Sequence, residues 1–112
     1  MVWRHAIELV SLIYRTSASW PADERFGLIS QIRRASVSVP SNIAEGHSRA
    51  SRGEYLQFLG HARGSLAEVE TQIEIASNLG FLPADRIPAV KSAIDEVSRM
   101  LTSLIRSLQH SG

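Results

Sequence analysis

The sequence predicts an all-α fold, a single domain of residues 1–112 that forms an antiparallel, up-and-down, left-handed four-helix bundle. Apolar residues recur every three or four positions in four segments, which is the period of an amphipathic helix. Short segments containing Gly, Pro and Ser separate these helices, so neighbouring helices are expected to run antiparallel. No segment alternates apolar and polar residues as a half-buried strand does.

The first helix is expected over residues 2–17, and the segment at residues 17–21 ends it. Its predicted core face consists of Trp3, Ile7, Val10 and Ile13 or Tyr14.

The second helix is expected to begin near Pro21, because proline suits a first helical turn. Its predicted core stripe is Ile29, Ile32, Ser36, Val39 and Ile43. Pro40 removes a backbone donor and clashes with the preceding turn, yet the stripe keeps its phase through it. We therefore expect one helix that is kinked or locally opened near Pro40. Gly46 is expected to end it as a left-handed C-cap.

The third helix is expected from a capping box at Ser51 and Glu54 to about residue 78, with Gly80 ending it. Its predicted core stripe is Tyr55, Leu59, Ala62, Leu66, Val69, Ile73 and Ala76. A second stripe of small residues follows another face, at Gly53, Gly60, Gly64 and Ala67. Glycine is unfavourable inside a helix, so this stripe predicts close packing of another backbone in an oligomer. The alternative is that solvent-facing glycines are tolerated there.

The fourth helix has the clearest periodicity, a heptad stripe that follows a turn at residues 81–85. Its members are Ile87, Val90, Ile94, Val97, Leu101, Leu104 and Leu108.

Composition narrows the function classes. The chain has no cysteine, which excludes disulfides and thiolate metal sites and fits a cytoplasmic location. No apolar run approaches the roughly 20 residues that span a bilayer, so no membrane association is expected. The four histidines form none of the Glu-x-x-His pairs of bundle metal sites, and no nucleophile elbow or phosphate loop is present. We therefore predict no metal, no cofactor, no small-molecule substrate and no enzymatic activity.

Charge is unevenly distributed, although the net charge is only +1. Residues 25–63 contain six arginines against Glu45 and Glu54, whereas residues 64–96 contain six acidic residues against Arg86 and Lys91. Such asymmetry marks a basic partner face or complementary charge between neighbouring helices or subunits. The candidate nucleic-acid-binding residues are Arg33, Arg34, Arg49, Arg52 and Arg63, which converge if the third helix folds back along the second. Alternatively, Arg63 pairs with Glu70 or Glu45.

The stretch at residues 33–46 concentrates the polar residues, and it reads RRASVSVPSNIAEG. A structural hypothesis is that Ser41, Asn42 and Glu45 satisfy the backbone opened by Pro40, with Glu68 belonging to the same polar motif.

With residues 58–59 and 62–68, this stretch resembles the bacterial four-helix-bundle proteins linked to intervening sequences of 23S ribosomal RNA genes. The resemblance covers nearly the whole chain. It implies an antiparallel bundle that assembles as a ring-like homo-oligomer, commonly a pentamer. The fold is also similar to accessory proteins of diversity-generating retroelements, which partner a reverse transcriptase and bind nucleic acid. The family's own activity is unassigned, and its name records genomic context. The motif positions are Arg33, Arg34, Pro40, Ser41, Asn42, Glu45, Gly46, Arg63, Gly64 and Glu68.

Three functional hypotheses follow. The first is a non-enzymatic oligomeric bundle that binds RNA, DNA or a nucleic-acid enzyme through its arginines. The second is a purely structural or protein–protein interaction module that binds no nucleic acid. The third is an enzyme that uses Glu45, His47 or Glu68, although no sequence pattern indicates a substrate pocket.

Overall fold

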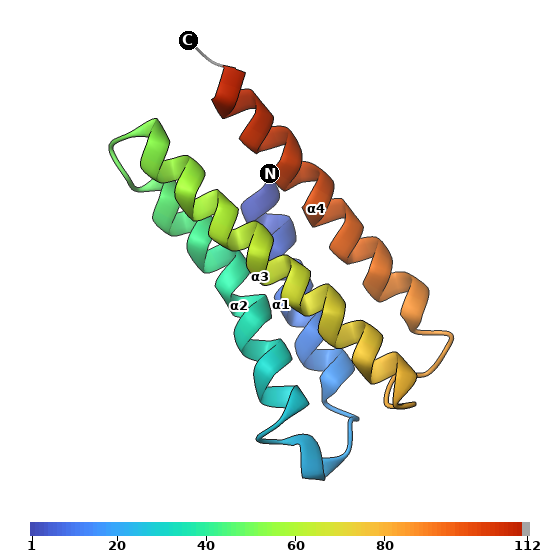
Figure 1. The fold of residues 1–112 in the computed structure, drawn as a ribbon. Helices are drawn as coiled ribbons and strands as arrows, with labels where there is room; N and C mark the ends of the chain where they lie inside the picture. The colour runs from blue at the N-terminus through green and yellow to red at the C-terminus, as the bar shows by residue number, and fades with distance from the viewer. Residues whose placement is uncertain (111–112) are drawn as a thin grey trace.

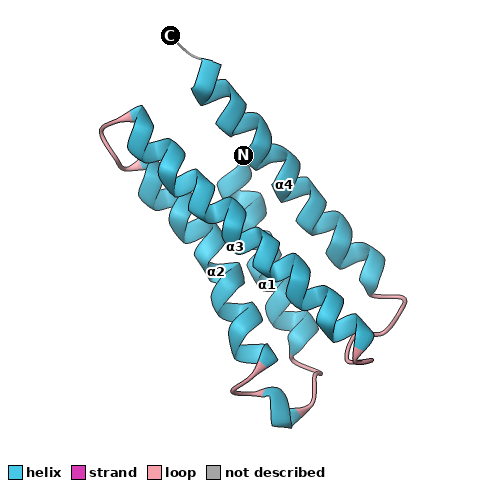
Figure 2. Cartoon of the chain, viewed as in Figure 1, coloured by secondary structure: helices cyan, strands magenta, loops and turns pink. Residues whose placement is uncertain are grey.

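The computed structural model describes residues 1–110, and helices dominate them (Figure 2). The long helices are α1 (Val2–Ser17), α2 (Leu28–His47), α3 (Arg52–Asn78) and α4 (Ile87–His110). A short 3₁₀ helix, η1 (Ala22–Glu24), lies between α1 and α2. The described residues contain no strand, so the predicted all-α fold class is confirmed.

The four helices pack in a ring, in which α1 contacts α2, α2 contacts α3, α3 contacts α4 and α4 contacts α1. Consecutive helices run antiparallel (Figure 1). The N-terminus, the α2–α3 loop and the end of α4 therefore lie at one end of an elongated bundle of 49 × 25 × 19 Å. The most extensive helix–helix contact is that between α2 and α3.

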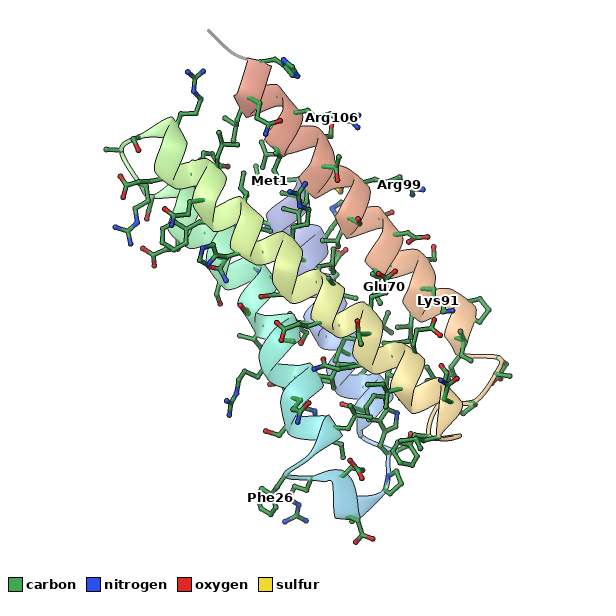
Figure 3. All side chains as sticks on the ribbon, viewed as in Figure 1. Met1, Phe26, Glu70, Lys91, Arg99 and Arg106 are labelled. Atoms are coloured by element: carbon green, nitrogen blue, oxygen red, sulfur yellow. The ribbon has the colours of Figure 1, made fainter. Side chains whose placement is uncertain are left out.

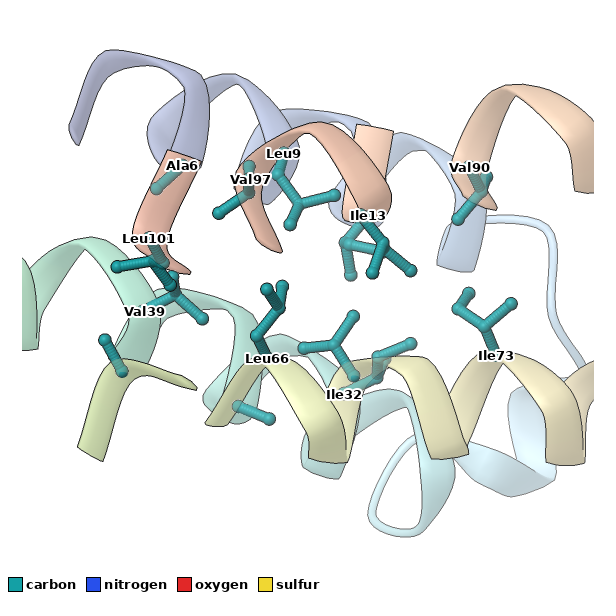
Figure 4. Packing of buried hydrophobic residues seen from close by; sticks show 14 of the residues in the cluster. Ala6, Leu9, Ile13, Ile32, Val39, Leu66, Ile73, Val90, Val97 and Leu101 are labelled. Atoms are coloured by element: carbon teal, nitrogen blue, oxygen red, sulfur yellow. The ribbon is translucent and has the colours of Figure 1, made fainter. Parts of the chain in front are cut away.

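The core follows the apolar stripes expected for α2, α3 and most of α4 (Figure 4). Near the end of α4, Ile105 is buried, whereas the predicted Leu104 and Leu108 are only partly buried. Ile32, Val39, Leu66, Ile73 and Leu101 are almost completely buried and face one another along the bundle axis. Burial of each such side chain contributes about 1.5–3 kcal/mol relative to exposure. Trp20 packs beside Phe81 at the end opposite the α2–α3 loop, with ring centroids 6.3 Å apart.

The predicted core face of α1 is wrong, because most of the buried residues lie one position before the predicted ones in the sequence. The buried apolar residues are Val2, Ala6, Leu9 and Ile13, of which only Ile13 was predicted. Trp3, Ile7 and Tyr14 are instead about 40% exposed on a neighbouring face. Adjacent residues lie ~100° apart on a helix, so two apolar stripes run side by side on α1. The sequence pattern favoured the bulkier stripe, whereas the close approach of the neighbouring helices accommodates the smaller one.

The start of α2 also differs from the prediction. Residues near Pro21 form η1, and α2 begins at Leu28 after Gly27. The Leu28 amide donates to the Glu24 carboxylate at 3.1 Å, so Glu24 satisfies one of the free donors at the positive end of α2. The helix then continues through Pro40 as a single element, and the prediction of one helix rather than two is confirmed.

Gly46 is not the predicted left-handed C-cap. The helix extends to His47, its C-cap Ser48 has φ −80°, and Gly80 is the only described residue with positive φ. A Cβ atom on Gly46 would lie 2.9 Å from Phe58 Cβ and 3.2 Å from the Tyr55 carbonyl oxygen. The glycine therefore permits the close approach of α2 and α3, which is a tertiary role rather than a local one.

Both ends of α3 match the prediction. The Glu54 amide donates to Ser51 Oγ at 3.1 Å, and the Ser51 hydroxyl donates to the Glu54 carboxylate at 3.3 Å. At the other end, Gly80 adopts φ +77°. The Gly80 amide donates to Ser77 O and the Phe81 amide to Ala76 O, which is a Schellman motif.

Candidate nucleic-acid interface

The five arginines proposed from the sequence do not form one cluster in the chain. Arg33 and Arg34 are adjacent on α2, so their side chains leave the helix about 100° apart. Arg49 lies in the short α2–α3 loop, and Arg52 is the first residue of α3. Arg63 is an exposed residue near the middle of α3.

Arg33 joins α1 to α2. Its Nε donates to Ser17 Oγ at 2.9 Å and its Nη2 donates to the Tyr14 carbonyl oxygen at 3.2 Å. The guanidinium also lies 4.6 Å from the centroid of the Tyr14 ring. Ser17 donates in turn to Ile13 O at 2.8 Å. This cation therefore satisfies groups in the last turn of α1, where positive charge complements the helix dipole.

Arg34 instead lines a groove of about 470 Å³ between α2 and α3, together with Glu68 and Gln72. Gln72 is 9% exposed, and its Oε1 atom is buried without a hydrogen-bond partner. Within residues 1–110, Arg34 and Glu68 do not form an ion pair with each other. The groove is polar, and it was not foreseen from the sequence because its walls come from two helices.

The polar motif around Pro40 has a structural bonding pattern. Asn42 Nδ2 donates to the Ser38 carbonyl oxygen at 2.8 Å and to Ser38 Oγ at 2.9 Å. The Ser65 hydroxyl donates to the same Ser38 Oγ at 2.9 Å. The hydrogen bonds that link Asn42, Ser38 and Ser65 thus connect the helical turn around Pro40 to α3. Ser41 is exposed.

Arg49 is held at the α2–α3 loop by two contacts. Its Nη2 lies 2.8 Å from the Glu45 carboxylate, and its guanidinium lies 5.0 Å from the centroid of the Phe58 ring. Both side chains of the ion pair are half exposed, so the pair contributes about 0–1 kcal/mol. Glu45 therefore pairs with the adjoining α2–α3 loop, and no ion pair within residues 1–110 involves Arg63.

The small-residue stripe of α3 faces away from the core. Gly53, Gly60 and Gly64 are exposed, and a Cβ atom at any of them would meet nothing within 4 Å. Ala67 continues the same exposed face. No backbone among residues 1–110 packs against these three glycines.

The tertiary structure separates charge along the bundle. We define the loop end as residues 1–9, 38–64 and 99–110, the half that contains the N-terminus and the α2–α3 loop. Figure 3 shows Met1, Arg99 and Arg106 toward this end, with Glu70 and Lys91 nearer the other. The loop end carries three carboxylates, Glu8, Glu45 and Glu54. It carries six arginines, all exposed: Arg4, Arg49, Arg52, Arg63, Arg99 and Arg106. The opposite half has eight carboxylates against six basic side chains, so the two halves have opposite net charge.

An apolar groove of about 760 Å³ opens at the loop end, with Trp3, Ile43, Tyr55 and Met100 in its walls. Residues of all four helices line this groove. The His47 ring meets the Tyr55 ring edge-on, with ring centroids 5.8 Å apart. Burial raises the pKa of the Tyr55 hydroxyl above its ordinary value.

The residues that bear this geometry match a family model described as 23S rRNA-intervening sequence protein, over residues 1–103. The chain belongs to this family. All ten motif positions that carried the sequence resemblance fall within the matched range.

A solved structure supports the family fold. The chain superposes with a TM-score of 0.84 on a Bacteroides thetaiotaomicron protein of unknown function from the S23 ribosomal protein family. The two are 21% identical, and the match covers 94% of this chain and 98% of that one. No protein of curated function matches the chain. The family is thus one of unknown function rather than a known enzyme family.

Two features of this family member bear on its chemistry. Residues 1–110 contain no group of three or more His, Cys, Asp or Glu side chains that could hold a metal ion. None of the helices described for the chain is long and apolar enough to cross a membrane.

Proposed function

We propose that the chain is a non-enzymatic, self-associating helical bundle that binds nucleic acid through the arginines of the loop end. The observation that carries this proposal is the separation of charge along the bundle, with six exposed arginines against three carboxylates at one end. Arginine guanidinium groups bind phosphate oxygens in bidentate fashion, and clustering them raises the local potential. A nucleic-acid enzyme with its substrate bound would present the same phosphate groups, so we propose it as an alternative partner. We place the interaction in the cytoplasm.

Two unlike exposed faces support self-association. Trp3, Ile7, Tyr14 and Val37 present bulky apolar side chains on α1 and α2, each about 40% exposed. The small-residue stripe of α3 presents a flat surface with open space above three glycines. The bulky face of one copy can pack on the flat face of the next, which is a heterologous contact. Repeating this contact forms a closed ring when the rotation between neighbouring copies divides a full turn evenly. A ring such as a pentamer is the proposed assembly.

A ring would strengthen the proposed nucleic-acid contact. Cyclic symmetry orients every copy alike along the axis, so each copy places its loop end on the same side. The arginines of all copies then act together on one polyanion, and binding depends steeply on salt.

The test is a binding titration of structured RNA and duplex DNA over a salt series. A triple variant, Arg49→Gln, Arg52→Gln and Arg106→Gln, is compared with a matched variant at the opposite half, Arg15→Gln, Arg25→Gln and Arg86→Gln. Each lost phosphate contact lowers the slope of log affinity against log salt by about 0.9 for duplex DNA. We expect the first variant to lower the slope by about 2–3 and the second to leave it unchanged. Binding that is absent at micromolar protein, or equal losses in both variants, would refute the proposal.

A second candidate function is a purely structural or protein-interaction module. It is favoured by the use of Arg33 and Asn42 inside the bundle, where they bond to the backbone of α1 and α2. In this case the chain self-associates normally and shows no salt-sensitive binding to RNA or DNA.

A further inference from the structure

We propose that the apolar groove at the loop end is the docking site for a second copy of this chain, which inserts Phe26 from the opposite end of its bundle. The contact joins copies head to tail along the bundle axis. It goes beyond the proposed function, because the proposed ring uses the side faces of α1, α2 and α3 and because the head-to-tail contact requires no nucleic acid.

The groove suits an apolar occupant. Its volume is about 760 Å³, and its lining includes the side chains of Trp3, Ile43, Met100 and Leu104. A mostly apolar concave surface of this size is typical of a binding site. It has room for an aromatic side chain together with part of the segment that carries it.

The opposite end of the bundle presents such a side chain. We define the tip segment as residues 18–27, which join α1 to α2 and include η1. Phe26 in this segment is 89% exposed, more than any other large apolar residue among residues 1–110. Figure 3 shows Phe26 at the end of the bundle far from Arg106. The Arg25 guanidinium lies 6.0 Å from the centroid of its ring, yet most of the ring surface is free for a contact.

The groove and the tip segment lie at the two ends of α1. This helix has 16 residues against 27 in α3, so it spans about 24 Å beside the roughly 40 Å of α3. Residues 1–3 line the groove, and in Figure 1 the N-terminus lies short of the α2–α3 loop and of the end of α4. The tip segment follows the other end of α1. A copy displaced along the bundle axis therefore places Phe26 above the groove of its neighbour.

The charges of the two ends attract each other. Arg4 and Arg106 are exposed, and each adjoins a residue that lines the groove. The tip segment contains two carboxylates against the single Arg25, a net charge of −1. The whole halves agree, because the loop end has an excess of arginines and the opposite half an excess of carboxylates. Complementary charge favours the head-to-tail orientation, whereas two grooves or two tips facing each other would bring like charges together.

The contact is expected to be weak and sensitive to salt. One aromatic side chain and its flanking residues bury far less than the roughly 1,200 Å² of a stable interface, so attraction between the ends has to contribute. Screening shortens the range of that attraction from about 30 Å in 10 mM salt to about 8 Å in physiological salt. We therefore expect head-to-tail association in low salt, whereas the apolar side contacts of the proposed ring persist in physiological salt.

Engineered cysteines test the contact directly, because the chain has none of its own. Two full-length variants, Ala22→Cys in the tip segment and Ser103→Cys in the groove, are mixed in low salt and treated with a short bis-maleimide. One variant carries a tag, so that the products differ in mass. The control replaces the second variant with Ser92→Cys, an exposed position three turns earlier on the same face of α4 and outside the groove.

We expect the pair with Ser103→Cys to crosslink in about tenfold higher yield than the control pair, because a formed contact raises the effective concentration of the two thiols. Equal yields for the two pairs would overturn the inference. Crosslinking of Ser103→Cys to itself in the same yield would indicate a groove-to-groove contact and would also overturn it.

Phe26 is then varied in the Ala22→Cys background. Phe26→Asp should lower the crosslink yield about tenfold, since a charge cannot enter the apolar groove without a partner. Phe26→Leu should retain most of the yield. Both variants should keep the melting temperature of the parent, because the side chain is 89% exposed. An unchanged yield for Phe26→Asp would contradict insertion of this ring.

Excess duplex DNA separates the inference from the proposed function. A specific crosslink that DNA prevents supports both, because both ligands then compete for the loop end. A specific crosslink in a protein that binds no DNA supports the head-to-tail contact and counts against the proposed function. Salt-sensitive DNA binding without a specific crosslink refutes the head-to-tail contact and leaves the proposed function standing.

Discussion

The Arg33 guanidinium lies 4.6 Å from the centroid of the Tyr14 ring and donates to the Tyr14 carbonyl oxygen at 3.2 Å. One side chain of α2 thus satisfies an acceptor in the last turn of α1 and covers the ring of the same residue. Stacking and directional hydrogen bonding both require the planar guanidinium, so lysine is not an equivalent residue here.

Replacing Arg33 should lower stability rather than nucleic-acid affinity. We expect Arg33→Ala to reduce the free energy of unfolding by about 1–3 kcal/mol, because charge-assisted hydrogen bonds to Ser17 and Tyr14 are lost. Arg33→Lys should recover less than half of that loss. Urea denaturation measures the change, with Arg63→Ala as an exposed control outside the ion pairs. Equal unfolding midpoints for Arg33→Ala and the control would show that this contact is not stabilising.

Glycines on the two faces of the α2–α3 pair should respond oppositely to alanine. Gly46→Ala places a Cβ 2.9 Å from Phe58 Cβ, an atom close to the backbone that cannot rotate away, and should destabilise by about 1–3 kcal/mol. Gly60→Ala meets nothing within 4 Å and should stabilise the chain by about 0.5–1 kcal/mol. Thermal unfolding of both variants tests this, and the same sign of change in both would contradict it.

Removing the Asn42 amide should weaken the turn around Pro40. Asn42→Ala loses two hydrogen bonds to Ser38 and should cost about 1–3 kcal/mol. Ser41→Ala, at the exposed neighbouring position, should change stability by less than about 0.5 kcal/mol. The two melting temperatures are compared at equal protein concentration. An Asn42 variant with an unchanged melting point and oligomer mass would leave the network without a structural role.

The exposed apolar stripe of α1 should control assembly. Ile7→Glu introduces a charge among Trp3, Tyr14 and Val37, which would be buried unpaired in the proposed ring. We expect this variant to be a folded monomer in sedimentation velocity, and Gly64→Leu on the small-residue stripe of α3 to behave likewise. Leu79→Glu, which lies at the C-cap of α3, is the control and should retain the mass of the parent assembly. A monomeric parent protein, or a full-sized Ile7→Glu assembly, would rule out this contact.

Most of the fold was predictable because its signals are local or periodic. The capping box at Ser51 and the left-handed Gly80 involve residues within a few positions of each other. Each of the helices α2, α3 and α4 has one main apolar stripe, so the sequence pattern indicated one core face for each. On α1 the pattern offered two apolar faces one residue apart, and Trp3 was assigned to the wrong one.

The candidate site was less predictable, because residue type and spacing leave the partner of a charged side chain undetermined. Arg33 and Arg34 are adjacent in the sequence, yet one binds the end of α1 and the other lines a groove beside Glu68. Arg4 and Arg106 were not candidates, since nothing in the sequence places the first helix beside the last turns of α4. Gln72 gave no signal at all, because an unpaired amide oxygen is recognisable only once its surroundings are known.

The sequence by itself determined that this protein is four helices with three well-defined apolar faces, because propensity, capping and periodicity act within one helix. Tertiary structure alone decided the role of Gly46, the second face of α1, the separation of charge along the bundle and the groove around Gln72. Each of these depends on which helices lie side by side and in which direction they run. Contacts between helices are set by packing over the whole core, and no local stretch of residues contains that information.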